Sequence, residues 1–202
     1  MKKIHILFVL AITSLGPVSA DAPGKHEGFF ANLMLGGGLG GYTYTSGTTK
    51  ETGTGGTFQY GGKLGYALSG NFALFGALDG WSLSNPSVTL TTGSSTQSGT
   101  AQNATYSVFM FGGGIGFFTD SRFFILGTIG LASGKATQNN ISVSSDYGFG
   151  ANINIGQEWE IAKDFGIGVA LVGHYSSVKY PITNSPSFTQ FYVGVAVSAS
   201  YN

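Results

Sequence analysis

The chain contains no cysteine. Exported domains often draw stability from disulfides, so this chain needs another source, and a closed hydrogen-bonded sheet can supply it. The absence also excludes a cysteine-linked lipid anchor and any metal site built from Cys and His ligands. His5 lies near the N-terminus and His26 stands alone, so His-only ligation is not supported either. We expect no metal and no cofactor.

Charge is scarce as well. Charged residues make up 9% of the chain, with nine basic and nine acidic side chains, against about 25% in an ordinary soluble domain. This balance argues against a nucleic-acid partner. The 34 glycines would suit a disordered chain, but 14% aromatic and 42% hydrophobic residues indicate a folded protein. A surface so poor in charge is poorly soluble in water, so we expect lipid to cover it.

Long apolar runs are missing too, so no transmembrane helix is expected. Lys2 and Lys3 precede an apolar stretch, Ile6–Ile12, and the small residues Val18-Ser19-Ala20. This pattern predicts a signal peptide at residues 1–20, cleaved after Ala20, and one domain at residues 21–202. An anchoring helix is the alternative, but the apolar stretch is much shorter than the ~20 residues needed to span. Cleavage leaves seven basic and nine acidic residues, a net charge of −2.

Along the chain, long polar segments alternate with short turns. The long segments are Thr45–Gly55, Ser84–Thr105, Lys135–Asp146 and Lys179–Ser187. The short turns are Ser69-Gly70-Asn71, Thr119-Asp120-Ser121-Arg122 and Ala162-Lys163-Asp164. Seven connections join eight strands, and every second connection is tight. The pattern predicts an all-β fold: an eight-stranded up-and-down antiparallel transmembrane β-barrel.

Four of the expected strands alternate between apolar and small or polar residues, as strands between lipid and lumen do. The outward residues begin with Phe58, Tyr147, Phe165 and Phe191, and continue at every second position. In the first strand we expect Phe29, Ala31, Leu33 and Leu35 outward and Asn32 inward. In Phe72–Leu83, Asp79 must face inward, because a carboxylate among acyl chains is costly. This turns Phe75 and Trp81 inward, so a bulge near Gly80 is considered. Residues 106–118 and 123–134 are apolar on both faces, and no orientation is predicted for them.

Aromatic residues gather towards both ends of the strands. Near the short turns lie Tyr66, Phe72, Phe117, Phe123, Trp159, Phe165 and Tyr201. Near the long polar segments lie Tyr42, Phe58, Tyr60, Trp81, Tyr106, Tyr147 and Tyr175. Two belts of this kind are typical of the two interfaces of a membrane.

These features together resemble the small outer-membrane barrels of the OmpA and OmpX type. Gly28-Phe29-Phe30, Gly36-Gly37-Gly38 and the last five residues, 198–202, also resemble a group of uncharacterised outer-membrane barrels. The resemblance implies the cell outer membrane, with both termini in the periplasm and four long loops at the cell surface. It also implies outer-membrane lipid as a partner, and recognition of the final strand by the barrel-assembly machinery. Tyr201 would be the aromatic signal, although Asn202 follows it, which departs from the usual pattern.

Inside the barrel, Lys63, Asp79 and Glu158 are expected to form a charge cluster, since buried charges need partners. His174 also faces the lumen on this reading. We expect a static plug, because eight strands leave an interior that side chains fill. The alternative is a narrow channel gated by these charges.

His174-Tyr175-Ser176 resembles the His-x-Ser step of the PagL family of lipid A deacylases. In that family an Asn follows and a Glu on the neighbouring strand completes the triad. Here Ser177 replaces the Asn, and no acidic residue occurs from Asn184 to Asn202. A base and nucleophile without an orienting carboxylate make a poor triad. A PagL-type hydrolase using His174 and Ser176 is therefore the alternative, and a non-enzymatic protein is expected.

Recognition is left to the loops. Ser84–Thr105 carries no charge and is rich in Ser, Thr, Gly, Gln and Asn. It suits a hydrophilic shield, a carbohydrate-like contact surface or a mobile tether. Its length favours a functional role, because loops this long without secondary structure are uncommon in compact domains. The expected role is structural or surface interaction, with an unknown surface ligand.

Overall fold

The computed structural model describes residues 28–69, 71–180 and 187–201. The predicted signal peptide and its cleavage site at Ala20 lie outside these residues, as does Asn202. Within the described ranges the chain forms strands, which belong to one antiparallel sheet. None of these residues forms a helix long and apolar enough to cross a membrane.

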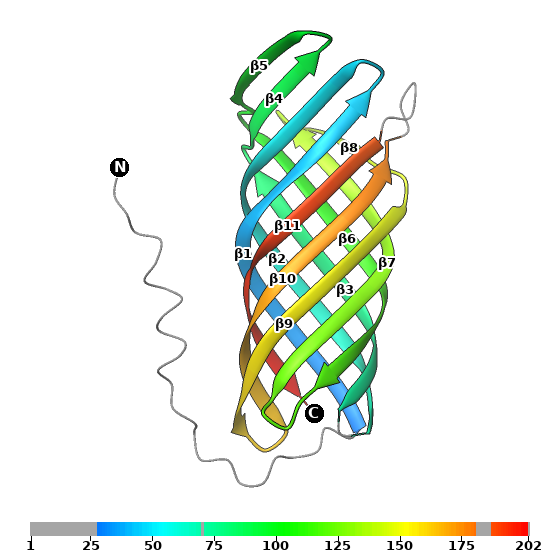
Figure 1. Ribbon diagram of the computed structural model, residues 1–202, viewed down its shortest axis with the longest axis vertical. Coiled ribbons are helices and arrows are strands. Elements are labelled where there is room, and N and C mark those ends of the chain that lie inside the picture. The colour runs from blue at the N-terminus through cyan, green and yellow to red at the C-terminus, as the bar shows by residue number, and fades with distance from the viewer. Residues whose placement is uncertain (1–27, 70, 181–186, 202) are drawn as a thin grey trace, which may run out of the picture.

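Eight of the described strands close into a ring (Figure 1). They are β1 (Gly28–Ser46), β2 (Thr49–Ser69), β3 (Phe72–Ser84), β6 (Ala104–Phe118), β7 (Phe123–Gln138), β9 (Gly148–Ala162), β10 (Phe165–Lys179) and β11 (Ser187–Tyr201). Each pairs with its neighbours in this order, and β1 closes the ring by pairing with both β2 and β11. Ala31, for example, lies opposite Leu64 on one side and Tyr201 on the other. The predicted eight-stranded barrel is confirmed.

The side chains alternate as the sequence predicts. In β11 Val193, Val195 and Val197 are exposed on the outer wall, while Tyr192 and Ala196 are buried inside. The predicted faces of β1, β2, β9 and β10 are confirmed in the same way. Along the middle of the eight described strands, the outward positions carry no charged side chain. The outer wall is therefore apolar where acyl chains would surround it.

β3 keeps its alternation without interruption. Asp79, Phe75 and Trp81 are all buried inside, and the register between β2 and β3 runs unbroken past Gly80. The bulge considered near Gly80 is absent from this ladder; the register shifts instead between Ala67 and Ser69. The ring of Tyr60 lies against Gly80 from the outer side, so a Cβ at this position would require that ring to move.

The two strands without a predicted orientation also alternate. β6 turns Phe109, Phe111 and Ile115 outward, and β7 turns Ile125 and Ile129 outward. Their inner faces are apolar as well and carry the buried residues Val108, Met110, Phe118, Phe124 and Leu126. The barrel interior is thus locally hydrophobic at this wall, which explains why periodicity alone gave no orientation.

The rim that carries the short turns, here the turn rim, has the predicted aromatic belt. Phe72 contacts Phe117 with ring centroids 5.2 Å apart, and Tyr201 contacts Phe29 and Phe165. The belt predicted at the opposite rim is only partly correct. Phe58, Tyr60, Tyr147 and Tyr175 are exposed outside. Tyr42 and Trp81 are instead buried inside, and Tyr106 packs against the interior with them, because all three occupy inward positions of their strands.

The opposite rim, here the hairpin rim, is where the prediction of long loops is wrong. β1 and β2 stay paired to Ser46 and Thr49, so only Gly47 and Thr48 form a turn. Segment 84–105 contains β4 (Ser87–Thr92) and β5 (Ser95–Thr100), and segment 135–146 contains the end of β7 and β8 (Ile141–Ser144). β10 reaches Lys179, and residues 181–186 of the fourth predicted loop lie outside the described residues. Threonine explains the error: it is polar, but its branched Cβ favours strands.

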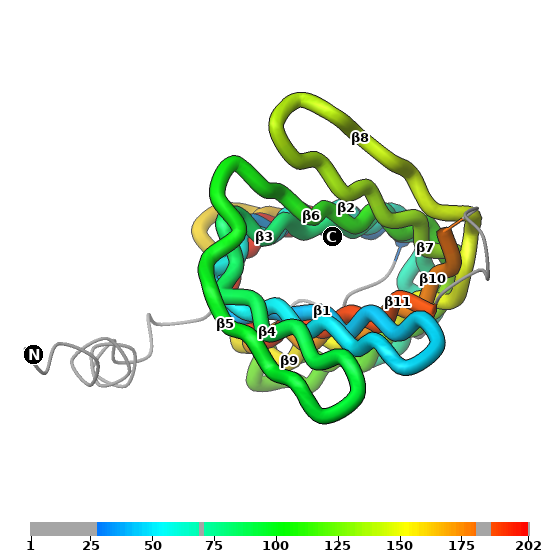
Figure 2. The backbone as a smooth tube through the Cα atoms, turned by 90° about the horizontal axis from the view of Figure 1, so that it is seen from above, coloured from blue at the N-terminus to red at the C-terminus, as the bar shows by residue number. Residues whose placement is uncertain are grey.

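β4 continues the path of β3 along β2. Thr57 lies opposite Leu83 and Thr54 lies opposite Ser87, so β3 and β4 carry one residue more than β2 over this interval. The extra residue makes a bulge at Asn85-Pro86, where Asn85 has a positive φ of 47° and Pro86 lacks an N–H. Seen along the barrel axis, hairpins β4–β5 and β7–β8 lean away from the ring on different sides (Figure 2).

Candidate functional sites in the lumen and at the hairpin rim

Lys63 and Asp79 form a buried ion pair in the lumen. They stand on neighbouring strands β2 and β3, and the Lys63 Nζ lies 3.3 Å from the Asp79 Oδ1. Both side chains are sealed from the surface, with exposed fractions of 0% and 2%. A buried charge is costly unless it is paired, so each residue requires the other. The sequence correctly predicted this contact.

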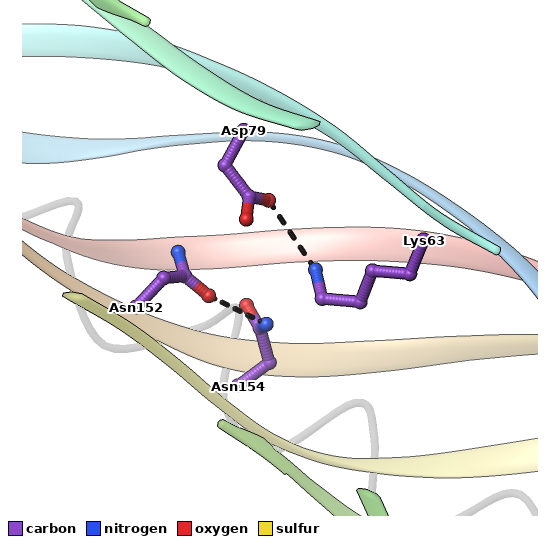
Figure 3. A network of polar contacts seen from close by, with 4 residues as sticks. All are labelled: Lys63, Asp79, Asn152 and Asn154. Atoms are coloured by element: carbon purple, nitrogen blue, oxygen red, sulfur yellow. Dashed lines mark hydrogen bonds and ion pairs between the residues drawn. The ribbon is translucent and has the colours of Figure 1, made fainter. Parts of the chain in front are cut away.

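Two amides face the ion pair from the other side of the interior. The Asn154 Nδ2 donates a hydrogen bond of 2.7 Å to the Asn152 Oδ1, and both residues come from β9. Figure 3 shows the amide pair and the ion pair beside each other within the barrel. The polar middle of the lumen therefore combines a neutralised charge pair with neutral amides.

Glu158 is not part of this cluster. No ion pair among the described residues joins it to Lys63, and the charged groups that influence it are Arg122 and Glu160 at the turn rim. Its neighbours are the hydroxyl of Ser200 and the backbone of Gly166. The predicted three-residue cluster is therefore wrong in this member. Glu158 and Lys63 are separated from their turns by similar numbers of residues. Because the strands of a barrel are tilted, similar separations on opposite walls do not place two residues at the same height along the barrel axis.

His174 and Ser176 both face the lumen, as predicted, but they do not form a dyad. The Ser176 Oγ lies 3.5 Å from the Gln190 Oε1, on the neighbouring strand β11. His174 packs edge-on against Trp81, with ring centroids 6.3 Å apart, and its Nε2 has no hydrogen-bond partner among the described residues. Neither side chain reaches the outer wall, where a lipid substrate would lie.

Aromatic side chains close the lumen on both sides of this polar layer. Near the turn rim, Phe30 contacts Phe75 and Phe118 at 6.1 and 5.5 Å, and Phe118 contacts Phe124. Towards the hairpin rim, Trp81 stacks on Tyr192. The interior resembles a packed core more than an open pore, as is expected of eight strands.

A second aromatic cluster fills the mouth at the hairpin rim. It consists of Tyr42, Tyr44, Tyr106, Tyr180 and Phe188, whose rings make a chain of contacts between 4.3 and 6.5 Å. Burial, and then the neighbouring Tyr106, raise the pKa of Tyr180 to about 12, so its phenol is neutral at physiological pH. We call these five residues the mouth cluster.

Above the mouth, β2, β4 and β5 form a small sheet with two different faces. The outer face carries hydroxyls that meet across the strands: Thr89 with Ser98 at 3.1 Å and Thr91 with Thr96 at 3.4 Å. All six residues of β5 are exposed, and none is charged. Segment 84–105 is therefore an ordered sheet and not the mobile tether considered from the sequence.

A polar hollow of about 670 Å³ lies beside this sheet on the hairpin rim. It is lined by Ser84, Asn85, Asn103, Thr105, Thr137, Asn139 and Asn140. Four of these are asparagines in left-handed backbone conformations, which asparagine tolerates better than most residues. Two of them form the tight β7–β8 turn, where both central residues need a positive φ. The hollow offers amides and hydroxyls and no charge.

The inner face of the same sheet contains residues that the sequence reasoning missed. Glu51 lies opposite Leu90, and Leu90 lies opposite Gln97, so the three share one face. Together with Val88 and Tyr106 they line a pocket of about 370 Å³ at the mouth. The alternation in Ser87-Val88-Thr89-Leu90 was the signal that would have identified this face as part of a strand.

Within the described ranges, no group of three or more His, Asp or Glu side chains is placed to hold a metal ion. At the turn rim Arg122 forms an ion pair with Glu160.

Known structures of the same architecture resemble this one. Neisserial surface protein A (NspA) superposes with a TM-score of 0.53 at 8% sequence identity, over 86% of this chain and 96% of that chain. OprG from Pseudomonas aeruginosa gives 0.43 at 13% identity, over 88% and 99%. Ail, the attachment invasion locus protein of Yersinia pestis, gives 0.42 at 13% identity, over 85% and 99%. At such identities the likeness concerns the fold alone.

No curated protein matches the sequence. A family model does: the outer membrane protein beta-barrel domain matches residues 8–198, nearly the whole chain. The closed ring, the apolar outer wall and the polar layer inside it are the features expected of such a domain. This chain belongs to the family of outer membrane protein beta-barrel domains, and its location is the outer membrane.

Proposed function

We propose that this barrel is a non-enzymatic surface protein whose hairpin rim faces the outside of the cell and contacts a hydroxyl-rich partner there. The observation that carries the proposal is the ordered sheet of β2, β4 and β5, which projects beyond the barrel and displays uncharged hydroxyls. A fixed array of donors and acceptors loses less conformational entropy on binding than a mobile loop does.

The chemistry of this rim favours an uncharged, hydroxylated partner such as a glycan. The outer face of the sheet presents Thr and Ser side chains, and the adjacent hollow presents four asparagines. These hydroxyls and amides donate and accept hydrogen bonds, and one exposed cation, Lys50, stands beside Thr91 on the same outer face. One such contact is weak, so stable attachment relies on many copies acting together.

Two alternatives have less support. A PagL-type hydrolase needs an activated serine that reaches lipid, whereas Ser176 is buried in the lumen beside Gln190. A channel gated by lumen charges needs a free path, whereas Lys63 and Asp79 are paired between layers of aromatic rings. Mass analysis of lipid A with and without the protein tests the first alternative. Planar-bilayer recordings of the wild type and of Lys63→Met test the second.

The glycan contact is tested with whole cells on a glycan array. A variant with Thr89→Val, Thr91→Val, Thr96→Val and Ser98→Ala removes the four outer hydroxyls that meet in pairs, and the three β-branched valines help to preserve the strands. The matched control is Thr49→Val with Thr92→Val, because these two hydroxyls meet at 3.4 Å on the inner face of the same sheet. We expect the outer variant to lose binding and the control to retain it. Equal binding by both would refute the proposed contact.

The orientation is tested by chemical labelling, which the absence of cysteine makes simple. Thr48→Cys places a thiol at the tip of the β1–β2 hairpin, and Asp120→Cys places one in an exposed turn at the other rim. A membrane-impermeant maleimide should label the first variant in intact cells and the second only after the envelope is opened. The reverse pattern would invert the proposed orientation.

Export through a cleaved signal peptide and recognition of β11 by the barrel-assembly machinery belong to the same proposal. β11 ends at Tyr201, whose ring lies on the outer wall between Phe29 and Phe165. N-terminal sequencing of the mature protein tests the cleavage, and loss of assembly in Tyr201→Ser tests the recognition.

A further inference from the structure

Glu51 is a carboxylate without a cation. It lies on the inner face of β2, half-buried at the mouth, and among the described residues it forms no ion pair. Tyr42 donates a hydrogen bond of 2.6 Å to its Oε1, and no hydrogen bond from another described residue occupies Oε2. The neighbouring Lys50 alternates to the outer face of the strand and is exposed there. One oxygen of Glu51 therefore remains available to a ligand.

The carboxylate is held in a fixed position. The ring of Tyr42 packs against Gly53, where a Cβ would collide with it, and stacks on Phe188 at 4.9 Å. The ring of Tyr106 lies 4.3 Å from that of Tyr42 and also lines the pocket. A tyrosine hydroxyl thus orients the acid, and aromatic faces adjoin it. Aromatic faces and a carboxylate attract the same kind of ligand, a cation.

The rest of the pocket is aliphatic where it faces Glu51. Leu90 lies directly opposite Glu51 in the strand pairing and is 38% exposed, and Val88, two residues earlier, lies on the same face. Thr at position 90 would keep the strand equally well, so the exposed Leu90 is available to contact the aliphatic part of a ligand. The pocket volume of about 370 Å³ is within the range of small-molecule sites.

We propose that this pocket binds a small organic ammonium ion with an aliphatic body. The ammonium group contacts the Glu51 carboxylate and the ring of Tyr106, and the aliphatic body lies on Val88 and Leu90. The site goes beyond the glycan contact, because it uses the inner face of the sheet whose outer face carries the hydroxyls. Its occupancy does not depend on which way the barrel is inserted.

The test uses the full folded barrel in detergent micelles, with n-hexylammonium as the probe and NMR spectra of the backbone amides as the readout. We expect saturable shifts of the amides of residues 50–52, 88–91 and 97–99. Hexanoate, which has the same body and the opposite charge, should not shift them. Methylammonium, which lacks the body, should bind more weakly.

Three variants separate the contributions. Glu51→Gln keeps an acceptor for the Tyr42 hydroxyl but removes the charge, and should weaken hexylammonium binding by about two- to fivefold. Asp146→Asn removes an acid that the pocket lining does not include, at the same rim, and should change nothing. Leu90→Ser should weaken hexylammonium but not methylammonium. Gel electrophoresis of heated and unheated samples verifies that each variant is folded: a folded barrel migrates more slowly after heating than before it.

Three results would overturn the proposal. One is equal affinity of Glu51→Gln and the wild type for hexylammonium. Another is an equal response to hexanoate. The third is a set of shifts confined to lipid-facing amides such as those of Val193 and Val195, which would mean adsorption through the micelle.

Discussion

The two halves of β2 belong to one hydrogen-bonded ladder with β1, but they carry different kinds of side chain. Residues 57–67 pair with β1 and β3 and turn Phe58, Leu64 and Tyr66 outward. Residues 49–54 pair with β1 and β4 and turn Lys50, Thr52 and Thr54 outward. The hydrogen bonds continue across the boundary without a break in β1–β2 pairing. In this chain the hydrophobicity of a strand's outer face therefore indicates whether lipid or water surrounds it. It does not indicate whether the segment forms a strand.

The inner face of β2 repeats the contrast. Lys63 in the lower half is buried and paired with Asp79, whereas Glu51 in the upper half is half-buried and paired with no cation among the described residues. The first arrangement suits stability, and the second leaves a charge available to a ligand. The following four substitution pairs probe this difference and then the stability of the two projecting hairpins.

The largest effect is expected when the buried pair is broken. Lys63→Met leaves the Asp79 carboxylate uncompensated in the lumen and should lower the free energy of unfolding by about 3–5 kcal/mol. Glu51→Gln, on the same face of the upper half, should change it by less than about 0.5 kcal/mol. Urea unfolding of the barrel in lipid vesicles measures both. If Lys63→Met combined with Asp79→Leu does not recover most of the loss, the ion pair is not its cause.

The second-largest effect is expected when a charge is placed on the outer face of β2, where the loss of stability should differ between its two halves. Leu64→Arg places a guanidinium among acyl chains and should cost about 2–4 kcal/mol, whereas Thr54→Arg, above the aromatic belt, should cost about 0–1 kcal/mol. Leu64 and Thr54 are both exposed on the same face of β2. The same vesicle unfolding experiment applies. Similar losses for the two variants would place the membrane boundary elsewhere.

A smaller effect is expected in the β7–β8 turn. Asn140 has a φ of 69°, so Asn140→Ala should cost roughly 1–2 kcal/mol through the left-handed backbone. Amide exchange should accelerate at residues 135–138 and 141–144 and remain slow at residues 123–132, which pair with β9. The matched control is Gln138→Ala, beside the same turn. Uniform acceleration along β7 would show that hairpin and barrel unfold together.

The smallest effect is expected for the hydroxyls of the projecting sheet. Thr91→Val removes the contact with Thr96 but keeps a β-branched side chain, and should change the stability by no more than about 0.5 kcal/mol. Thr89→Val provides a second measurement at the contact with Ser98. Amide exchange of residues 87–92 is the readout. Marked acceleration would mean that hydroxyl contacts, rather than backbone pairing, maintain the sheet.

Much of the barrel wall was predictable because one face of each strand meets lipid. Asp79 alone fixed the orientation of β3, since a carboxylate that faces acyl chains is costly; in the structure it pairs with Lys63 inside the barrel. The orientation of β6 was not predictable, because Met110 and Phe111 are both apolar although one faces the lumen and the other faces outward. Because phenylalanines line the lumen near the turn rim, the inward positions of that wall are as apolar as the outward ones, and the sequence shows no alternation in polarity there.

The candidate sites were predictable only in part. The contact of Lys63 with Asp79 follows from their positions in one hairpin, where distances are short and the register is known. Glu158 lies across the barrel, and its height depends on strand tilt, which no local pattern encodes. The pocket at Glu51 was missed because segments 45–55 and 84–105 were interpreted as loops, and loops have no faces on which Glu51 and Leu90 could be aligned.

The backbone pairing of β4 with β2 has one further consequence. Its hydrogen bonds are made by main-chain groups, so they do not depend on which side chains stand on the outer surface. Thr89, Thr91, Thr96 and Ser98 can each be exchanged for another strand-compatible residue while the wall beneath stays the same. If the hairpin rim faces outward as proposed, the surface of this sheet can therefore change while the barrel that carries it keeps its structure.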